Sequence, residues 1–311
     1  MDRAAPPCGA RKRLTNIRDT RRGALAVTVQ SRSTAITRLP VRRLGAADLP
    51  ACIELTVDRG WSAEETKWRL MLAVSEIYGV DDPAGGLAGV VGLTRYGAEL
   101  AVVGMMLVAS RHGRQGLGRR LMNHVLERAN GAVVYLTATD LGRGLYAQLG
   151  FRAIDTSTRY IGMFTPRAGV ADYPIREVTA AELTGIAAAD LAAFGADRSL
   201  VLAQVRTVAD RFVECGEPVS GYAAAWPNGD TTVIGPVVAD DLSMATALIS
   251  RVADGCSGPL RIDVLGRHRS LAAWARRRGL QAGASTTLMV HGGALPRQRA
   301  RLFAPVNIAI G

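Results

Sequence analysis

The sequence predicts an α/β (α+β) protein built from two similar halves, and three observations support this. Apolar stretches of strand-like composition alternate with stretches whose apolar positions recur every three or four residues, as in amphipathic helices. A glycine-rich segment at 113–118 separates one such strand from one such helix. The order of elements in residues 39–166 recurs in residues 174–311, which indicates an internal duplication.

Length and composition bound the class of protein. The 311 residues are enough for two domains of ordinary size, and 48% of them are apolar. No apolar run reaches the roughly 18 residues of a membrane span, so we expect no membrane partner. The four cysteines form no C-x-x-C pair and, together with the four histidines, show no metal-ligand spacing. We therefore expect no metal and a cytoplasmic protein.

The net charge of +11 is concentrated at one end of the chain. Residues 1–38 hold nine Arg and Lys residues against two Asp residues, which accounts for +7. Their lack of sustained apolar periodicity predicts a disordered basic tail. The remaining residues are only mildly basic, and no ladder of aromatic residues accompanies the charge. Nucleic acid is therefore a disfavoured partner.

The first elements after the tail are a strand and two helices. Residues 39–44 have the pattern of an edge strand, and a helix is expected to begin at residues 47–48 with Asp48 as its N-cap. In the next helix, Ser62 and Glu65 have the spacing of a capping box. Trp61, just before this helix, has the character of a core or lid-packing residue.

A short antiparallel meander is expected next, with strands near residues 77–80, 88–96 and 100–109. The last strand leads into the glycine-rich loop and then into a helix that begins at about Leu117. Such a loop directs several free backbone N–H groups and the positive end of the helix dipole at one point. A phosphate or pyrophosphate is the natural ligand of this arrangement.

Three kinds of phosphate loop compete for this segment. A Walker loop requires Lys-Ser/Thr after its last glycine, but Arg119 and Arg120 follow Gly118. A dinucleotide fingerprint requires a third glycine where Leu121 stands. The remaining kind is an acyl-coenzyme loop. Gly113-Arg114-Gln115-Gly116-Leu117-Gly118 resembles the R/Q-x-x-G-x-G/A acyl-CoA loop of the GNAT N-acetyltransferases, with Gly113 in place of the usual Arg or Gln.

A second motif supports the resemblance. Leu145-Tyr146-Ala147-Gln148-Leu149-Gly150-Phe151 matches the L-Y-x-x-L-G-F ending of the GNAT family, about 30 residues after the loop and with one expected strand, 132–139, between them. The resemblance implies two tandem GNAT-like domains, each a mixed and mostly antiparallel sheet flanked by helices. Residues 39–166 form the first domain, 167–173 a linker and 174–311 the second domain.

The second domain is expected to lack the coenzyme. Its counterpart of the loop, residues 237–242, has no glycine and carries Asp240 and Asp241, which would repel a pyrophosphate. Trp274 stands where the first half has Tyr146, and an indole offers no acidic O–H. One coenzyme per chain is therefore expected.

The resemblance also implies the site residues. Acetyl-CoA is expected as the co-substrate, and Tyr146 as the catalytic group that supplies a proton to the departing thiolate. No general base is assigned, and Glu76, Asp81, Asp82 and His112 stay open. The residues expected to bind the coenzyme are Leu107, Val108, Gly113, Arg114, Gln115, Gly116, Leu117, Gly118, Arg119 and Asp140.

Three functions follow as alternatives. The leading one is an acetyl-CoA-dependent N-acetyltransferase that acts by direct attack of a primary amine of a small molecule, such as an amino acid, a polyamine or an aminoglycoside-like compound. The second is a protein Lys or N-terminal acetyltransferase. The third is a non-catalytic acyl-CoA-sensing or nucleic-acid-binding module that uses the basic tail. A homodimer also stays open.

Overall fold

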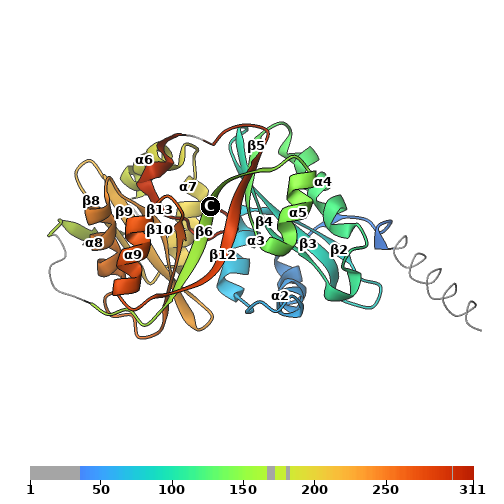
Figure 1. The fold of residues 1–311 in the computed structure, drawn as a ribbon, viewed down its shortest axis with the longest axis horizontal. Helices are drawn as coiled ribbons and strands as arrows, with labels where there is room; N and C mark the ends of the chain where they lie inside the picture. Colours follow the sequence, from blue (N-terminus) through green and yellow to red (C-terminus); the bar gives the residue numbers. More distant parts are fainter. Residues whose placement is uncertain (1–35, 167–171, 180–182, 296) are drawn as a thin grey trace, which may run out of the picture.

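The computed structural model describes residues 36–166, 172–179, 183–295 and 297–311. Most of the expected basic tail and of the expected linker lies outside these residues. Figure 1 shows the two halves side by side, the first at the right and the second at the left. Within these ranges, no helix is long and apolar enough to cross a membrane.

The first half contains the meander and the strand-loop-helix unit that the sequence predicts. Its elements are β1 (Arg42–Arg43), α2 (Leu49–Asp58), α3 (Glu65–Val74), β2 (Glu76–Asp81), β3 (Leu87–Tyr96), β4 (Leu100–Val108), α4 (Leu117–Ala129), β5 (Val133–Ala138), α5 (Asp140–Gln148) and β6 (Arg152–Gly162). Neighbouring strands from β1 to β4 pair antiparallel, whereas β4 and β5 pair parallel.

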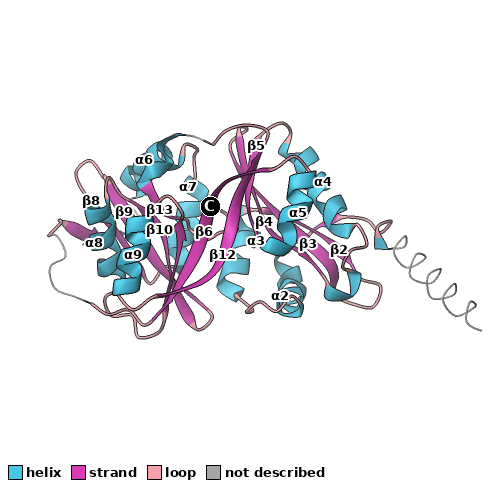
Figure 2. Cartoon of the chain, in the orientation of Figure 1, coloured by secondary structure: helices cyan, strands magenta, loops and turns pink. Residues whose placement is uncertain are grey.

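The second half repeats the order of these elements. They are β7 (Ile175–Glu177), α6 (Leu183–Phe194), α7 (Ser199–Val208), β8 (Arg211–Cys215), β9 (Gly221–Asn228), β10 (Thr231–Val238), α8 (Leu242–Ala253), β11 (Leu260–Leu265), α9 (Arg269–Arg277), β12 (Gln281–His291) and β13 (Leu302–Ala304). The series β10-α8-β11-α9-β12 corresponds to β4-α4-β5-α5-β6. The mixed sheet flanked by helices confirms the predicted fold class (Figure 2).

The two halves share one 13-stranded sheet because they exchange their last long strands. The main strand order is β1-β2-β3-β4-β5-β12-β6-β11-β10-β9-β8-β7. Strand β12 of the second half pairs with β5 of the first, and β6 of the first half pairs with β11 of the second. The exchanged strands also pair with each other at the centre of the molecule (Figure 1).

The hydrophobic core follows this shared sheet. One buried cluster joins α2 and α3 to α6 and α7, and includes Trp68, Phe194 and Trp226. On the other face of the first half, α4 and α5 cover a second cluster that contains Leu121 and Tyr146. Helices α8 and α9 cover the third cluster. Two apolar layers therefore enclose the part of β4 that leads into the loop.

Three local predictions fail or hold only in part. The edge strand expected at 39–44 is present only as Arg42–Arg43. Asp48 is the N-cap residue of α2, as predicted, but it makes no cap bond to that helix, because its carboxylate accepts hydrogen bonds from Arg42 and from the Gly45 N–H. The capping box expected at Ser62 and Glu65 is wrong, since α3 begins at Glu65 without a side-chain cap.

A buried ionic network explains the start of α3. Glu64 lies in the left-handed region at φ +45° and is 5% exposed. Its carboxylate accepts hydrogen bonds from Lys67 in α3 and from Arg261 in β11 of the other half. Burial alone would raise the pKa of Glu64, but these two cations lower it to about 2. The network therefore holds α3 against the second half through a charged carboxylate.

Candidate active site

A gap between β4 and β5 forms the centre of the site. The two strands pair in parallel from Leu100 and Val133 to Val103 and Leu136 and no further, although both continue beyond that point. The β3–β4 pairing shifts register at the same level, and Met105 adopts φ +48°. This irregularity turns the end of β4 away from β5. Among the described strands, none pairs with the backbone groups on that edge of β4 beyond Val103.

The glycine-rich loop lies at the open end of the gap. Arg114 and Gly116 both adopt left-handed conformations, at φ +61° and φ +87°. Gly116 is the N-cap of α4, and its carbonyl accepts the first helical hydrogen bond, from the Arg120 N–H. No side chain caps this helix end among the described residues. The N–H groups of the first turn therefore point outward as an anion-binding cradle.

The gap and the loop line one cavity of about 830 Å³. Side chains of β4 lie on both faces of the sheet beside this cavity. Met105 and Leu107 belong to the core beneath α2 and α3, whereas Met106 and Val108 pack against the core beneath α4 and α5. The cavity thus reaches both faces of the sheet at the point where β4 and β5 separate.

Tyr146 of α5 lies in the wall of the cavity. Its side chain is 7% exposed and packs edge to face against Phe151, with ring centroids 6.0 Å apart. Burial raises the pKa of the Tyr146 hydroxyl to about 12, so the group stays protonated at neutral pH. Gly142, one turn earlier, makes room for the ring, since a Cβ there would lie 2.8 Å from ring atom Cε2.

Most of the predicted site residues meet at this cavity. The lining includes Tyr146 together with Leu107, Val108, Gly113, Arg114, Gly116, Leu117, Gly118 and Arg119. Gln115 lies outside the lining, and its side-chain amide donates to the Arg111 carbonyl within the loop. Asp140 is also outside the lining, as an exposed residue at the start of α5. Arg119 donates a hydrogen bond to Gln148 of α5.

Sequence reasoning missed part of the lining. Arg59 and Trp61, in the connection between α2 and α3, line the cavity, as does Thr137 of β5. Of the two roles predicted for Trp61, core or lid packing, its 39% exposure excludes the core, and no described contact tests the lid. A solitary Arg at the end of a helix has no sequence signature, so only the packing of α2 beside β4 reveals it.

The candidate bases are held in ion pairs. Glu76 pairs with Arg95, and Asp81 pairs with Arg42. The Asp82 carboxylate accepts a hydrogen bond from Arg111 and lies 2.5 Å from His112 Nε2. These contacts fix the position of the segment between β4 and the loop. His112 is the single one of these four groups that lines the cavity among the described residues.

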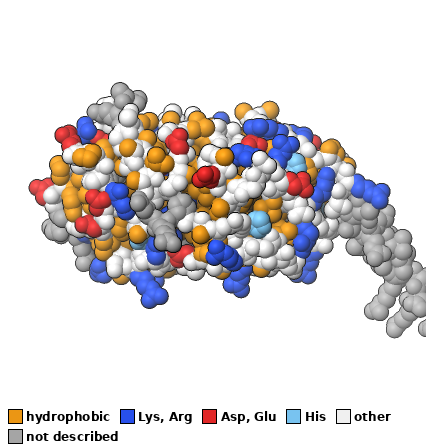
Figure 3. Space-filling view, turned by 90° about the horizontal axis from the view of Figure 1, so that it is seen from above, with side chains coloured by type: hydrophobic (Ala, Val, Ile, Leu, Met, Phe, Trp, Pro, Cys, Tyr) orange, Lys and Arg blue, Asp and Glu red, His pale blue; other side chains and the backbone are white. Residues whose placement is uncertain are grey.

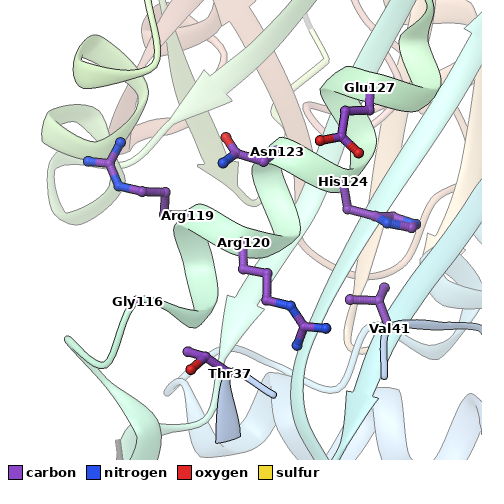
Figure 4. Close-up of a pocket in the computed structure, with 8 residues that line it drawn as sticks. All are labelled: Thr37, Val41, Gly116, Arg119, Arg120, Asn123, His124 and Glu127. Atoms are coloured by element: carbon purple, nitrogen blue, oxygen red, sulfur yellow. The ribbon is translucent and has the colours of Figure 1, made fainter. Parts of the chain in front are cut away.

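A second hollow of about 600 Å³ lies on the other side of α4 (Figure 4). It shares Gly116 and Arg119 with the main cavity. The Arg120 guanidinium and the His124 ring both point toward the segment that carries Val41 (Figure 4). In Figure 3, Lys and Arg side chains gather over the first half, at the right of the view. Arg119, Arg120 and His124 thus place basic side chains on this side of α4 as well, beside Glu127.

The corresponding gap in the second half is filled by the chain itself. Strands β10 and β11 pair in parallel from Thr232 to Ile234 and then separate, as β4 and β5 do. Strand β13 pairs with the free end of β10 at Val237 and Val238. A Cβ on Gly235 would lie 2.1 Å from the Pro305 carbonyl oxygen, which shows how closely this segment approaches β10.

The other expected differences of the second half are also in place. The Asp241 carboxylate accepts a hydrogen bond from the Met244 N–H and so occupies the N-terminus of α8. Asp240 pairs with Arg301. Trp274 is 8% exposed and packs against Phe164 and Arg278. The loop position of the second half therefore offers carboxylates where the first half offers free N–H groups.

Comparisons with known proteins agree with this architecture. Models of the acetyltransferase (GNAT) domain match residues 73–153 and residues 186–304. The chain is 27% identical over 266 residues to the uncharacterized N-acetyltransferase YitH of Bacillus subtilis, covering 83% of this chain and 94% of that protein.

Solved structures show the same fold. A putative acetyltransferase from Pyrococcus horikoshii aligns with a TM-score of 0.75 at 19% identity, covering 88% of this chain and 95% of that one. A tandem GNAT protein from the clavulanic acid biosynthesis pathway aligns with a TM-score of 0.58 at 15% identity, covering 83% of this chain and all of that one. This chain belongs to the GNAT acetyltransferase family and is an N-acetyltransferase with two GNAT domains in tandem.

Proposed function

We propose that the first half binds acetyl-CoA in the gap between β4 and β5 and transfers the acetyl group to a primary amine of a small molecule. The observation that carries this proposal is the single cavity that joins the open strand gap, the glycine-rich loop and Tyr146. Residues 39–166 would then be the catalytic domain, and residues 174–311 would act without a coenzyme of their own.

In this proposal the loop binds the pyrophosphate of the coenzyme, and β4 binds its pantetheine arm. The N–H groups of Gly116, Leu117 and Gly118 hold the pyrophosphate, with Arg114 and Arg119 adding positive charge at the rim. Free backbone groups of β4 beyond Val103 pair with the amide groups of the pantetheine arm, in the manner of an added strand. Gly113 can replace the usual Arg or Gln because backbone groups make most of these contacts.

Tyr146 supports the departure of the thiolate. The amine nitrogen attacks the thioester carbonyl carbon, a C–N bond forms and the C–S bond breaks, and the proton released by the amine ends on the thiol. Backbone N–H groups near Val108 stabilise the negative charge that develops on the carbonyl oxygen. The Tyr146 hydroxyl donates a hydrogen bond to the sulfur. Burial raises the pKa of this hydroxyl to about 12, so the donor carries its proton at neutral pH and up to about pH 10.

The filled gap of the second half supports one coenzyme per chain. Strand β13 lies where a second pantetheine arm would pair, and Asp241 occupies the end of α8. A cytoplasmic location and a homodimer stay predictions.

The test combines a loop variant with thiol release. The full chain is incubated with acetyl-CoA and an amine panel, and free thiol is measured together with the mass of the acetylated amine. Gly116→Ala places a side chain at φ +87° in the loop and should abolish coenzyme-dependent turnover. Gly97→Ala is the matched control, since Gly97 has φ +67° in an exposed turn away from the cavity. Turnover that survives in Gly116→Ala would contradict the role of the loop.

A further inference from the structure

The charges that line the cavity all have one sign. The basic side chains of the lining are Arg59, His112, Arg114 and Arg119. Among the described residues, the lining contains no Asp or Glu. His112, Arg114 and Arg119 lie in or beside the loop, where the anionic coenzyme is proposed to bind. Arg59 comes from a different part of the chain and has no such assignment.

Arg59 lies on the opposite face of β4 from the phosphate loop. It is the C-cap residue that follows α2, and α2 packs on the face of the sheet that carries Met105 and Leu107. The loop leads into α4, which packs on the other face together with Met106 and Val108. A molecule held by Arg59 therefore approaches the gap from the side opposite the pyrophosphate cradle, which is the side left for an acceptor.

The position of Arg59 is fixed, whereas its guanidinium is available. Both carboxylate oxygens of the preceding Asp58 accept hydrogen bonds from Ser110, one from its N–H and one from its hydroxyl, each at 2.7 Å. These bonds tie the end of α2 to the residue that follows β4. Arg59 is half-buried and makes no hydrogen bond or ion pair with another described residue. The Ser110 hydrogen bonds, and after them the charges of Arg59 and Arg111, lower the pKa of the Asp58 carboxyl.

The surroundings of Arg59 have the character of a small substrate pocket. Trp61 lies beside it in the lining and exposes 39% of its surface. Residues 308–309 border this lining, since Thr137 donates a hydrogen bond to the Ile308 carbonyl and a Cβ on Gly104 would lie 2.2 Å from the Ala309 oxygen. An indole surface and one cation thus remain exposed to an acceptor on this side.

We propose that Arg59 binds a carboxylate of the acceptor and that the acceptor is therefore an amino-acid-like amine, with Trp61 packing on its apolar part. The proposal rests on the acetyl transfer proposed above. A guanidinium recognises a carboxylate through two parallel hydrogen bonds, which also fixes the orientation of the neighbouring amine. Polyamines and aminoglycosides carry several positive charges and would meet Arg59 with like charge and no carboxylate.

The experiment compares matched amines on the full chain. Amino acids, their carboxamides, polyamines and aminoglycosides are each assayed with acetyl-CoA by thiol release. The carboxylate-bearing amines should be acetylated with kcat/KM at least 10-fold above their amides, because a charge-assisted hydrogen-bond pair is lost in the amide. In Arg59→Gln, KM for the best amino acid should rise about 10- to 100-fold with little change in kcat, and the preference over the amide should disappear.

Two controls separate this proposal from the proposed function. Arg69→Gln removes an exposed Arg of α3, where it pairs with Glu65, and should leave all rates unchanged. Calorimetry with acetyl-CoA should give the same Kd for the wild type and Arg59→Gln. A weaker coenzyme affinity in Arg59→Gln, an unchanged acid-to-amide preference, or acetylation of polyamines but of no amino acid would overturn the proposal. Failure of the wild type to bind acetyl-CoA would instead refute the proposed function.

Discussion

The Tyr146→Phe substitution removes one hydroxyl from the cavity wall and nothing else of the ring. The pKa of this hydroxyl is about 12, whereas a thiol titrates near 8.5. Complete transfer of the proton from Tyr146 to the thiolate would therefore cost about 5 kcal/mol, at 1.36 kcal/mol per pKa unit. Tyr146 accordingly acts as a hydrogen-bond donor to the sulfur. A hydrogen bond to a charged group contributes about 1.5–3 kcal/mol, so kcat should fall roughly 10- to 150-fold.

The assay is thiol release on the best amine of the panel, with the coenzyme Kd measured by calorimetry. The Kd should be the same in Tyr146→Phe, because the ring and its packing against Phe151 are kept. The wild-type rate should also persist up to pH 10, since the raised pKa keeps the hydroxyl protonated there. A loss of less than threefold in kcat, or an alkaline decline near pH 10 that vanishes in the variant, would refute this role.

Two further substitutions test the packing of the site and the junction of the halves. Gly142→Ala places a Cβ 2.8 Å from the Tyr146 ring and should lower kcat without lowering Tm. The control is Gly144→Ala, in the same helix with open space around it, which should raise the free energy of unfolding by about 1 kcal/mol and keep kcat. Equal kcat values in the two variants would contradict a displacement of Tyr146. Glu64→Gln should lower the free energy of unfolding by about 3 kcal/mol at pH 7, whereas the exposed control Glu65→Gln should change it little. Because the pKa of Glu64 is lowered from 4.5 to about 2, the stability that its charge contributes is present above pH 4.5 and is lost as the pH falls toward 2. Urea titrations in which the wild type and Glu64→Gln have the same free energy of unfolding at pH 7 would refute the network.

Local patterns predicted the elements that surround the site. The apolar run before Ser110, the glycines of the loop and the periodicity from Leu117 locate β4, the loop and α4 correctly. These features depend on neighbours in the chain, such as the freedom of Gly116 to adopt φ +87°. The repeat of the element order in the second half was visible for the same reason.

Long-range pairing could not be read from the sequence. Strand β6 pairs with β11 and strand β12 pairs with β5, so each strand finds its partner in the other half, and nothing in the local sequence of a strand specifies which half provides that partner. The capping box at Ser62 and Glu65 failed because Glu64 finds its charged partner Arg261 almost 200 residues away. The filling of the second gap by β13 and the place of Arg59 beside β4 are likewise set by packing.

In the proposed function, the first half holds an open coenzyme gap while the second half fills its own. Titration of the purified full chain with acetyl-CoA by calorimetry tests this difference most directly. One molecule should bind per chain in the wild type and none in Gly116→Ala. Two equal sites per chain, or one site that survives in Gly116→Ala, would contradict it.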